Sequence, residues 1–413
     1  MAVLALKGGK KVADGVQWPA WPIVDDEDRK AVLGALDSRS WCCLFANSRV
    51  KAFEEAYAKF HDAKHAIAAA NGTVSIELAL IAAGVLPGDE VLVPAVTFIA
   101  SASAIACAGA IPIFVDCDPE TYQISPTALA TAVTRRTKAI VAVHYGGYPV
   151  DFDAILPIVK KHNLVLIEDC AHAHGTEWKG RKVGAIGTAG SFSFQASKSL
   201  TAGEGGVVLT DDPALAEKAR LLHNIGRVPG KPGYEHYVLS SNYRMTEFQG
   251  ALLLSQMRRL TEQTDKKHEN GLFLAAGLRQ IGGLEPLKAD PRITKRGYYF
   301  FIARYSAEAF KGLPPDKFRA ALSAEGIPNG NGYAIPLYKQ VAFKEQNVTP
   351  LLPRKLGPRP KYEKIFLPNA ERICSEQVTI AHTMLLAERQ QIQLILDAVE
   401  KIKKHSDELM TRA

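Results

Sequence analysis

Two stretches decide the fold: Val165-Leu-Ile-Glu-Asp-Cys-Ala-His172 and Ser191-Phe-Ser-Phe-Gln-Ala-Ser-Lys-Ser-Leu-Thr-Ala-Gly-Glu-Gly-Gly206. Each begins with a short apolar run that fits a strand buried on both faces, and each then turns polar. The first contains the acid pair Glu168 and Asp169, and the second continues to Lys198 among small and polar residues. Ligands of an open α/β sheet bind beyond the carboxyl ends of its strands, so chemistry is expected at these two strand ends.

The pattern around these stretches is an alternation of apolar runs and helix-length segments. The runs predict strands at residues 65–70, 90–94, 111–115, 139–143, 164–168, 190–194 and 206–210. The segments between and after them predict helices at residues 74–85, 98–109, 125–134, 151–162 and 212–222. Strand after helix after strand indicates an α/β fold with a mostly parallel central sheet that is covered on both faces.

The chain is expected to contain three parts. Residues 1–35, with Trp and Pro and then a run of acids, predict an extended arm that leads into a helix. Residues 36–265 hold the alternation and predict a large domain. The alternation loosens after a long helix near residues 245–272, so residues 266–413 predict a smaller α/β domain, which ends in a helix over residues 387–404.

Composition excludes several classes of protein. Of the 413 residues, 47% are hydrophobic and 23% are charged, which is the balance of a soluble globular protein. The formal charge of +7 lies in no long run of one sign, so it does not predict nucleic-acid binding, although it suits an anionic small ligand. One uncharged run, residues 91–115, is long enough to span a bilayer, but Pro94 and Pro112 make strand, helix and strand a better fit.

The six cysteines form no C-x-x-C pair and no zinc-type spacing with histidine, so we expect buried free thiols and no metal site. Free thiols indicate a reducing compartment. The apolar start of the chain is too short for a signal peptide, and a cytoplasmic location is therefore expected.

Asp169 and Lys198 each have an ordinary structural interpretation. The carboxylate could cap a helix, and the lysine could be solvated. The lysine could also be a desolvated amine that forms a Schiff base, while a carboxylate at the end of a buried strand needs a cationic partner. Together they match the needs of pyridoxal 5'-phosphate (PLP), which requires a lysine for its aldehyde and a carboxylate that keeps its ring nitrogen protonated.

A phosphate-binding turn and an aromatic ring extend this hypothesis. Asn71-Gly-Thr-Val74 ends the first predicted strand and opens a helix, where free N–H groups, the helix dipole and the Thr73 hydroxyl would meet a phosphate. Thr73 could equally be an N-cap. Phe98, which follows the second strand, could stack on a flat ring or could pack in the core.

These residues, in this order, resemble the PLP-dependent aminotransferases of fold type I, and in particular the DegT/StrS family of sugar and aminocyclitol aminotransferases. The resemblance is dense from about residue 18 to residue 250 and thinner in the C-terminal domain. Besides the segment around Lys198, it includes Asn71-Gly-Thr, His144-Tyr-Gly-Gly, Glu168-Asp-Cys-Ala-His-Ala-His-Gly and Asn242-Tyr-Arg-Met. It implies a large PLP-binding domain and a smaller C-terminal domain.

The resemblance implies a role for each residue of a cofactor site. Lys198 and Asp169 would be catalytic: the lysine forms the Schiff base and moves a proton between substrate and cofactor, and the carboxylate pairs with the ring nitrogen. The other cofactor-binding residues would be Thr73, the Val74 amide and Ser193 at the phosphate, Phe98 on the ring, His172 at the ring or its 3-hydroxyl, and Asn242 from the neighbouring subunit of a homodimer.

Three further residues are implied to bind substrate. Arg244 would receive a donor carboxylate or a substrate phosphate, and Tyr333 and Tyr338 belong to a segment that resembles the lining of the acceptor pocket. The implied activity moves an amino group from glutamate or glutamine to a cyclic ketone, either an inosose-type cyclitol or a nucleotide-linked ketosugar, as in antibiotic biosynthesis. Ser38-Arg-Ser-Trp-Cys-Cys and Ala381-His-Thr-Met are more similar to the cyclitol branch.

Two alternatives stay open. One is another PLP enzyme on the same fold, such as a sugar dehydratase, a lyase or a desulfurase. Dehydratase relatives carry histidine in place of Lys198, and a desulfurase needs a mobile Cys, for which Cys374 is the one late candidate. The other is a non-catalytic regulatory module, which predicts a degraded lysine or carboxylate or an added helix-turn-helix, and the sequence shows none of these.

Overall fold

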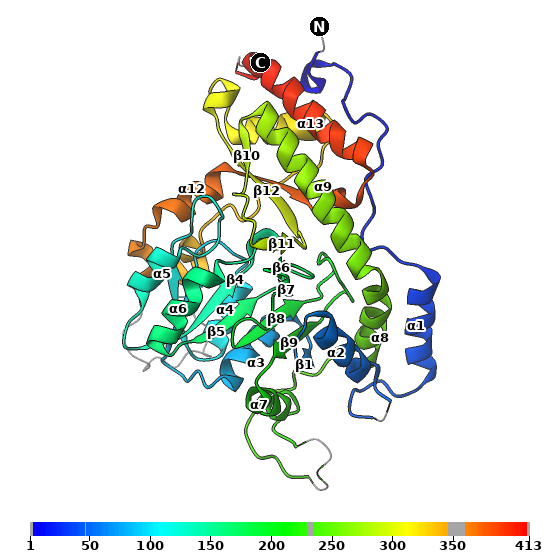
Figure 1. The fold of residues 1–413 in the computed structure, drawn as a ribbon, viewed down its shortest axis with the longest axis vertical. Coiled ribbons are helices and arrows are strands. Elements are labelled where there is room, and N and C mark those ends of the chain that lie inside the picture. Colours follow the sequence, from blue (N-terminus) through cyan, green and yellow to red (C-terminus); the bar gives the residue numbers. More distant parts are fainter. Residues whose placement is uncertain (1–2, 46, 229–230, 232–233, 346–359, 411–413) are drawn as a thin grey trace.

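The computed structural model describes residues 3–45, 47–228, 231, 234–345 and 360–410. A larger lower body and a smaller upper body lie along one long axis, with both chain ends at the top (Figure 1). The larger body is built on a seven-stranded sheet in the order β1-β9-β8-β5-β4-β2-β3. Its strands are β1 (His65–Ala69), β2 (Glu90–Pro94), β3 (Ile111–Val115), β4 (Thr137–Val143), β5 (Val165–Asp169), β8 (Ala189–Ser193) and β9 (Gly206–Thr210).

Neighbouring strands of this sheet are parallel except at β9, which is antiparallel to both β1 and β8. The predicted α/β fold with a mostly parallel central sheet is therefore confirmed, and each predicted strand is present. The uncharged run at residues 91–115 forms β2, α4 (Ala100–Cys107) and β3 as predicted. Among the described residues, no helix is long and apolar enough to cross a membrane.

Helices cover both faces of the sheet. One face carries α3 (Gly72–Ala82), α4 (Ala100–Cys107) and α7 (Pro213–His223). The other carries α2 (Arg49–Phe60), α5 (Pro126–Ala132), α6 (Phe152–His162) and α8 (Glu247–Gln256). Alternate residues of a strand point to opposite faces, so Val91 and Val93 lie in one core and Leu92 lies in the other. This two-sided burial explains why the strands appear in the sequence as continuous apolar runs.

Side-chain caps fix where the helices begin. Asn71 accepts a hydrogen bond from the Val74 N–H at the start of α3, and Asp151 and Asp212 cap α6 and α7 in the same way. The N-terminus of α3 therefore lies directly beyond the carboxyl end of β1.

The smaller body has its own apolar core around a three-stranded antiparallel sheet, β10-β12-β13. Its main elements are β10 (Leu284–Pro286), β12 (Phe300–Tyr305), β13 (Gln377–Ala381), α9 (Leu260–Ile281), α10 (Pro315–Ala324) and α13 (Arg389–Lys404). Leu4 and Ala13 of the N-terminal arm pack into this core. The remaining elements are α1 (Asp26–Asp37), α11 (Val341–Lys344), α12 (Pro368–Glu376), β6 (Glu177–Trp178), β7 (Arg181–Lys182) and β11 (Ile293–Lys295).

Two details differ from the sequence analysis. The long helix expected near residues 245–272 is two helices, α8 and α9, because a 3-10 turn at Met257–Arg259 separates them. α9 runs through the boundary that was placed after residue 265, so the division into three domains stays a prediction. Of the free cysteines, Cys107 at the end of α4 is exposed rather than buried.

Candidate active site

Asp169 is the last residue of β5 and lies at the carboxyl edge of the parallel strands. Its buried side chain accepts a hydrogen bond from Ser101 Oγ at 2.7 Å and another from the Ala171 N–H at 3.2 Å. The Ser101 hydroxyl lies 3.0 Å from that of Thr97. Among the described residues no salt bridge reaches the Asp169 carboxylate, so a cationic ligand would meet an oriented anion here.

Lys198 lies in the loop after β8, the strand that pairs with β5. Its side chain is 8% exposed, and burial lowers the pKa of its amine to about 8, while the Asp169 carboxylate raises it. Near pH 7, more of this amine is neutral than in a solvated lysine. The amine is therefore suited to act as a nucleophile or as a base.

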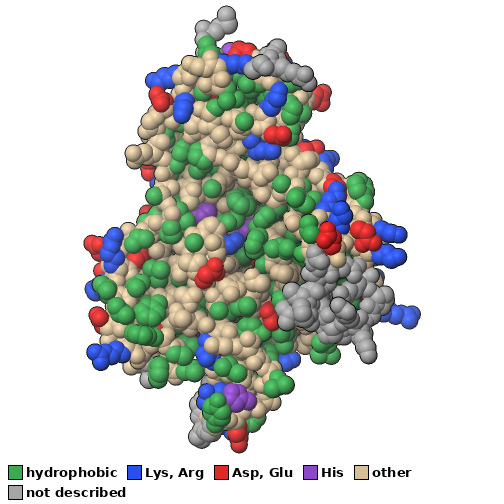
Figure 2. Space-filling model, turned by 180° about the vertical axis from the view of Figure 1, so that it is seen from behind, with side chains coloured by type: hydrophobic (Ala, Val, Ile, Leu, Met, Phe, Trp, Pro, Cys, Tyr) green, Lys and Arg blue, Asp and Glu red, His purple; other side chains and the backbone are tan. Residues whose placement is uncertain are grey.

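The loop that carries Lys198 is held by distant parts of the chain. The indole N–H of Trp21, in the N-terminal arm, donates to the carbonyl of Ala196 at 3.0 Å. His382, which follows β13, donates from Nε2 to the carbonyl of Ser197 at 3.0 Å. These contacts place the lysine at the waist between the two bodies, where Figure 2 shows histidine side chains beside a Lys or Arg side chain.

The N-terminus of α3 lies against Ser193 at the end of β8. A Cβ atom on Gly72 would come within 2.5 Å of Ser193 Cβ, so this close approach requires glycine. The N–H groups of Gly72 and Thr73 donate to no group in the described part of the chain. Together with the Ser193 hydroxyl, they form a set of hydrogen-bond donors for an anion. The Val74 N–H, which was predicted to hold a phosphate, donates instead to Asn71 Oδ1 at 3.1 Å.

His172 forms one wall of the site together with Tyr333. Its Nδ1 accepts a hydrogen bond from the Gly146 N–H at 3.3 Å, which places the ring proton on Nε2. Nε2 lies 3.5 Å from the Tyr333 hydroxyl. Burial holds the pKa of His172 well below its usual range, so the ring is neutral and offers an N–H donor.

Phe98 lies just before α4 and keeps 53% of its surface exposed. Its ring centre is 6.2 Å from that of Tyr333. Its carbonyl accepts the N–H of Ser101, the residue whose hydroxyl holds Asp169. An exposed ring near Tyr333 is available to stack on a flat ligand.

The structure places Tyr338 away from this group. Its side chain is buried, its hydroxyl donates to Glu371 Oε1 at 2.5 Å, and the same oxygen accepts the Leu367 N–H at 3.1 Å. Its ring packs near that of Phe114. The hydroxyl of Tyr338 is therefore engaged inside the core, and the assignment of Tyr338 to the acceptor pocket stays a prediction.

Arg244 and Asn242 make no hydrogen bond to the lysine loop among the described residues. Arg244 donates to Asn224 Oδ1 at 2.9 Å, and the exposed Asn242 accepts the N–H of Arg244 at 3.1 Å. This arrangement leaves Asn242 on the surface of its own chain. Its assignment to the site of a neighbouring subunit stays a prediction.

Ser101 and Tyr299 belong to the site but are not found by sequence reasoning. Ser101 precedes Asp169 by 68 residues, and its only signal is that α4 carries serines among small apolar residues. Tyr299 comes from the smaller body, and its ring stacks on His172 with centres 4.0 Å apart. The run Tyr298-Tyr-Phe-Phe301 gives no sign of which ring faces the site.

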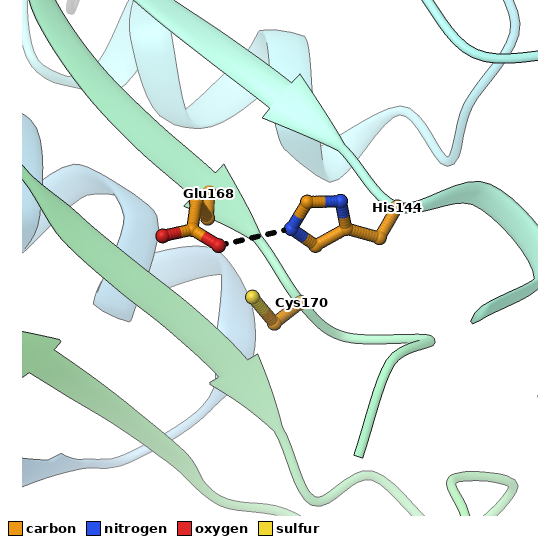
Figure 3. Close-up of side chains that lie close together, drawn as sticks. All are labelled: His144, Glu168 and Cys170. Atoms are coloured by element: carbon orange, nitrogen blue, oxygen red, sulfur yellow. Dashed lines mark hydrogen bonds and ion pairs between the residues drawn. The ribbon is translucent and has the colours of Figure 1, made fainter. Parts of the chain in front are cut away.

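A buried cluster of possible metal ligands lies beside the site, with ligand atoms of His144, Glu168 and Cys170 within 4.8 Å of one another (Figure 3). Their bonding capacity is already used. His144 donates from Nε2 to Glu168 at 3.1 Å, and its Nδ1 accepts the Val150 N–H at 3.1 Å. Glu168 also accepts backbone N–H groups from the turn at residues 184–187. Burial raises the pKa of the Cys170 thiol, so we interpret the cluster as support for the end of β5.

The fold and the site define a class of protein, the fold-type-I aminotransferases. The crystal structure of 3-amino-5-hydroxybenzoic acid (AHBA) synthase is 34% identical to this chain and has a TM-score of 0.84, covering 94% of this chain and 98% of that one. The aminotransferase from Psychrobacter cryohalolentis is 30% identical with a TM-score of 0.86, covering 95% of this chain and all of that one.

Within this class, residues 22–400 match the DegT/DnrJ/EryC1/StrS aminotransferase family, and the chain belongs to that family. The L-glutamine:2-deoxy-scyllo-inosose aminotransferase of Streptomyces fradiae is 36% identical over 426 residues, which cover 99% of each chain. The resemblance inferred from the sequence motifs is therefore confirmed, and the chain is an aminotransferase.

Proposed function

We propose that this aminotransferase uses PLP to move an amino group from glutamine or glutamate to a hydroxylated cyclic ketone of the inosose type. The observation that carries the proposal is the placement of Asp169 at the end of β5 and of Lys198 in the loop after β8, the adjacent parallel strand. The name of the Streptomyces fradiae relative, which specifies glutamine and 2-deoxy-scyllo-inosose, supports this donor and this acceptor.

The residues of the site fit PLP. Lys198 would bind the aldehyde, Asp169 would pair with the protonated ring nitrogen, and Phe98 would stack on the ring. The free N–H groups of residues 72–73, with the Ser193 hydroxyl, would hold the phosphate. When bound, PLP supplies an aldehyde that captures amines and a ring that accepts the electrons of a broken C–H bond.

Lys198 would carry the proton through the reaction. Its amine would take the proton from the α-carbon of the donor and deliver it to the carbon of the cofactor that carried the aldehyde. A pKa of about 8 suits an amine that must both accept and release a proton near neutral pH. Asp169, fixed by Ser101, would keep the ring nitrogen charged throughout.

The walls of the site favour an uncharged, hydroxylated acceptor. His172 offers a neutral N–H donor and Tyr333 offers a hydroxyl. Arg244, which could bind a phosphate, is bonded to Asn224 within its own chain. A nucleotide-linked ketosugar would require cations for its diphosphate. A free cyclitol ketone therefore suits these groups better.

We further propose that the chain works as a homodimer. Trp41, Leu44 and Phe45 expose 52%, 47% and 55% of their surfaces, and Leu239 is fully exposed. The segment at residues 41–45 and the segment at residues 237–239 are neighbours, because Leu44 and Tyr237 line one cavity of about 670 Å³. Exposed apolar side chains gathered in this way are typical of a surface that another chain covers.

The decisive experiment records the visible spectrum of the purified protein with PLP, before and after glutamine or glutamate is added. The donor-treated enzyme then receives either 2-deoxy-scyllo-inosose or a nucleotide-linked ketosugar, and mass spectrometry detects the aminated ring. We expect a spectral change that Lys198→Ala abolishes, and amination of the cyclitol. No spectral change with either donor would refute the proposal. A product that is both aminated and aromatic would indicate the chemistry for which AHBA synthase is named.

A further inference from the structure

Tyr299 precedes β12 and reaches into the site from the smaller body. Its ring centre lies 4.2 Å from Lys198 Nζ and 4.0 Å from the ring centre of His172. A cation this close to an aromatic face is attracted by the electrons of the ring. The Lys198 amine makes no hydrogen bond among the described residues, and it packs against the face of the Tyr299 ring.

The hydroxyl of Tyr299 is tied to the lysine loop. It lies 2.8 Å from Ser197 Oγ, and Ser197 Oγ donates to Gln195 Oε1 at 2.6 Å. Because the Ser197 hydroxyl proton is used in that second bond, the Tyr299 hydroxyl must be the donor in the first. The ring is therefore fixed to the residue next to the lysine that it faces.

The turn before Tyr299 is also held firmly. Tyr298 has a φ of 39°, which is rare for a tyrosine. Its carbonyl accepts hydrogen bonds from Ser199 Oγ at 3.2 Å and from Lys267 Nζ at 3.3 Å. A Cβ on Gly147 would come within 2.7 Å of the Tyr298 nitrogen, so the turn is closely packed as well as bonded. Tyr299 therefore has little freedom to move away from the site.

We propose that Tyr299 is a positioning residue that holds the Lys198 amine whenever the amine is not covalently bound to PLP. The proposal rests on the proposed function, because transamination frees the lysine each time the amino group passes to the cofactor. A free lysine side chain loses much rotamer freedom when it is fixed, so a preset partner speeds each return to the reacting carbon. The ring supplies the contact, and the bond to Ser197 sets the angle of the ring.

Several titratable groups surround the lysine, and they decide how a pH experiment is interpreted. They are Asp169 at the end of β5, His172 and His174 after it, His382 after β13, and Lys267 of α9 behind the Tyr298 carbonyl. Burial holds the pKa of all three histidines well below its usual range and lowers that of His382 to about 3. Asp169 favours the ammonium form of Lys198, as the ring of Tyr299 also does.

The test measures how fast the full-length protein, freed of cofactor, captures PLP at different pH values. Only the neutral amine attacks the aldehyde, so the pH midpoint of the rate reports the proton affinity of Lys198. Tyr299→Phe keeps the ring and should keep the midpoint. Tyr299→Leu removes the face that favours the ammonium and should lower the midpoint by about 1 pH unit. Tyr305→Phe, at the far end of β12 in the core of the smaller body, loses a buried hydroxyl bond to Leu313 and is the matched control.

A double-mutant cycle tests the bond between the hydroxyl groups independently. Tyr299→Phe and Ser197→Ala should each slow turnover, and the double variant should be no slower than either single variant. This cycle tests whether Tyr299 acts through the lysine loop, even if Tyr299→Leu does not fold. Losses that multiply, or an unchanged midpoint in folded Tyr299→Leu, would overturn the proposal. A wild-type protein that captures no PLP would overturn the proposed function, and this inference with it. A wild type that captures PLP, with variants that do not behave as expected, would overturn only the role of Tyr299.

Discussion

Asp169 is the residue whose charge the proposed chemistry needs most. Asp169→Asn preserves size and can still accept the bond from Ser101, but it removes the anion beside the ring nitrogen. We expect weaker PLP binding and a loss of turnover of about 100-fold or more, because breaking a buried charge pair costs about 3–5 kcal/mol. A PLP titration and steady-state rates at saturating PLP measure the two effects. Asp316→Asn, an exposed carboxylate of α10, is the control, and unchanged turnover in Asp169→Asn would contradict the pairing.

Ser101 is expected to act only through Asp169. Ser101→Ala removes the 2.7 Å hydrogen bond to the carboxylate and should lower turnover about 10-fold, since hydrogen bonds to charged groups contribute about 1.5–3 kcal/mol. Ser103→Ala, on the same helix, removes only a 3.5 Å bond to a backbone carbonyl and should leave the rate unchanged. Equal rates in the two variants would show that the bond from Ser101 does not orient Asp169.

Some site residues could be predicted from the sequence because a local pattern marks them, and others could not because only tertiary packing brings them to the site. Asp169 and Lys198 stand out because each breaks an apolar strand pattern within a few residues of its end. Tyr299 meets Lys198 only through the packing of the two bodies, and no local pattern records such a contact. Tyr338 differs again, since its segment resembles a pocket lining while its ring is buried in this chain, so its role stays a prediction.

At the scale of elements, the central sheet could be predicted because strands buried on both faces leave continuous apolar runs. The smaller body leaves a weaker trace, because its edge strand β10 spans only Leu284–Pro286. The turn at Met257–Arg259 contains no Gly or Pro, so nothing local separates α8 from α9.

Lys267 links α9 to the turn at Tyr298 and makes the stability of this junction depend on pH. Burial lowers the pKa of its amine from 10.5 to about 7, so between these values the unfolded chain binds a proton that the folded chain does not. Raising the pH from 7 to 9 therefore favours the folded state. Relative to Lys267→Met, the wild type should gain about 1 kcal/mol of unfolding free energy per pH unit.

Chemical denaturation at several pH values measures this difference between wild type and Lys267→Met. The neighbouring Lys266→Met removes an exposed lysine that pairs with Glu388, and its difference from wild type should stay flat over the same range. A flat difference for Lys267→Met as well would mean that the buried amine keeps its proton in the folded protein.

At the scale of the whole molecule, the site belongs to no single part of the chain. The larger body supplies Asp169 and Lys198, the N-terminal arm holds the lysine loop through Trp21, and the smaller body contributes Tyr299. A change in the relative placement of the two bodies would therefore move Tyr299 away from the lysine. The proposed homodimer extends this sharing to a second chain.

Subunit mixing tests whether each site uses Asn242 from the other chain. Lys198→Ala and Asn242→Ala are each expected to have little activity as separate homodimers. In a hybrid dimer, however, one site combines the native Lys198 of one chain with the native Asn242 of the other. Random mixing should restore about one quarter of wild-type activity, because half of the dimers are hybrids and one of their two sites is intact.

The matched control mixes Lys198→Ala with Asp169→Ala. Both residues are expected to serve the site of their own chain, so a hybrid of these two variants has no intact site and should regain nothing. Recovery in the first mixture alone would assign Asn242 to the partner's site. Equal recovery in both mixtures, none in either, or full activity from a monomer at micromolar concentration would refute the shared site. Asn242 would then serve only the surface loop in which it accepts the Arg244 N–H.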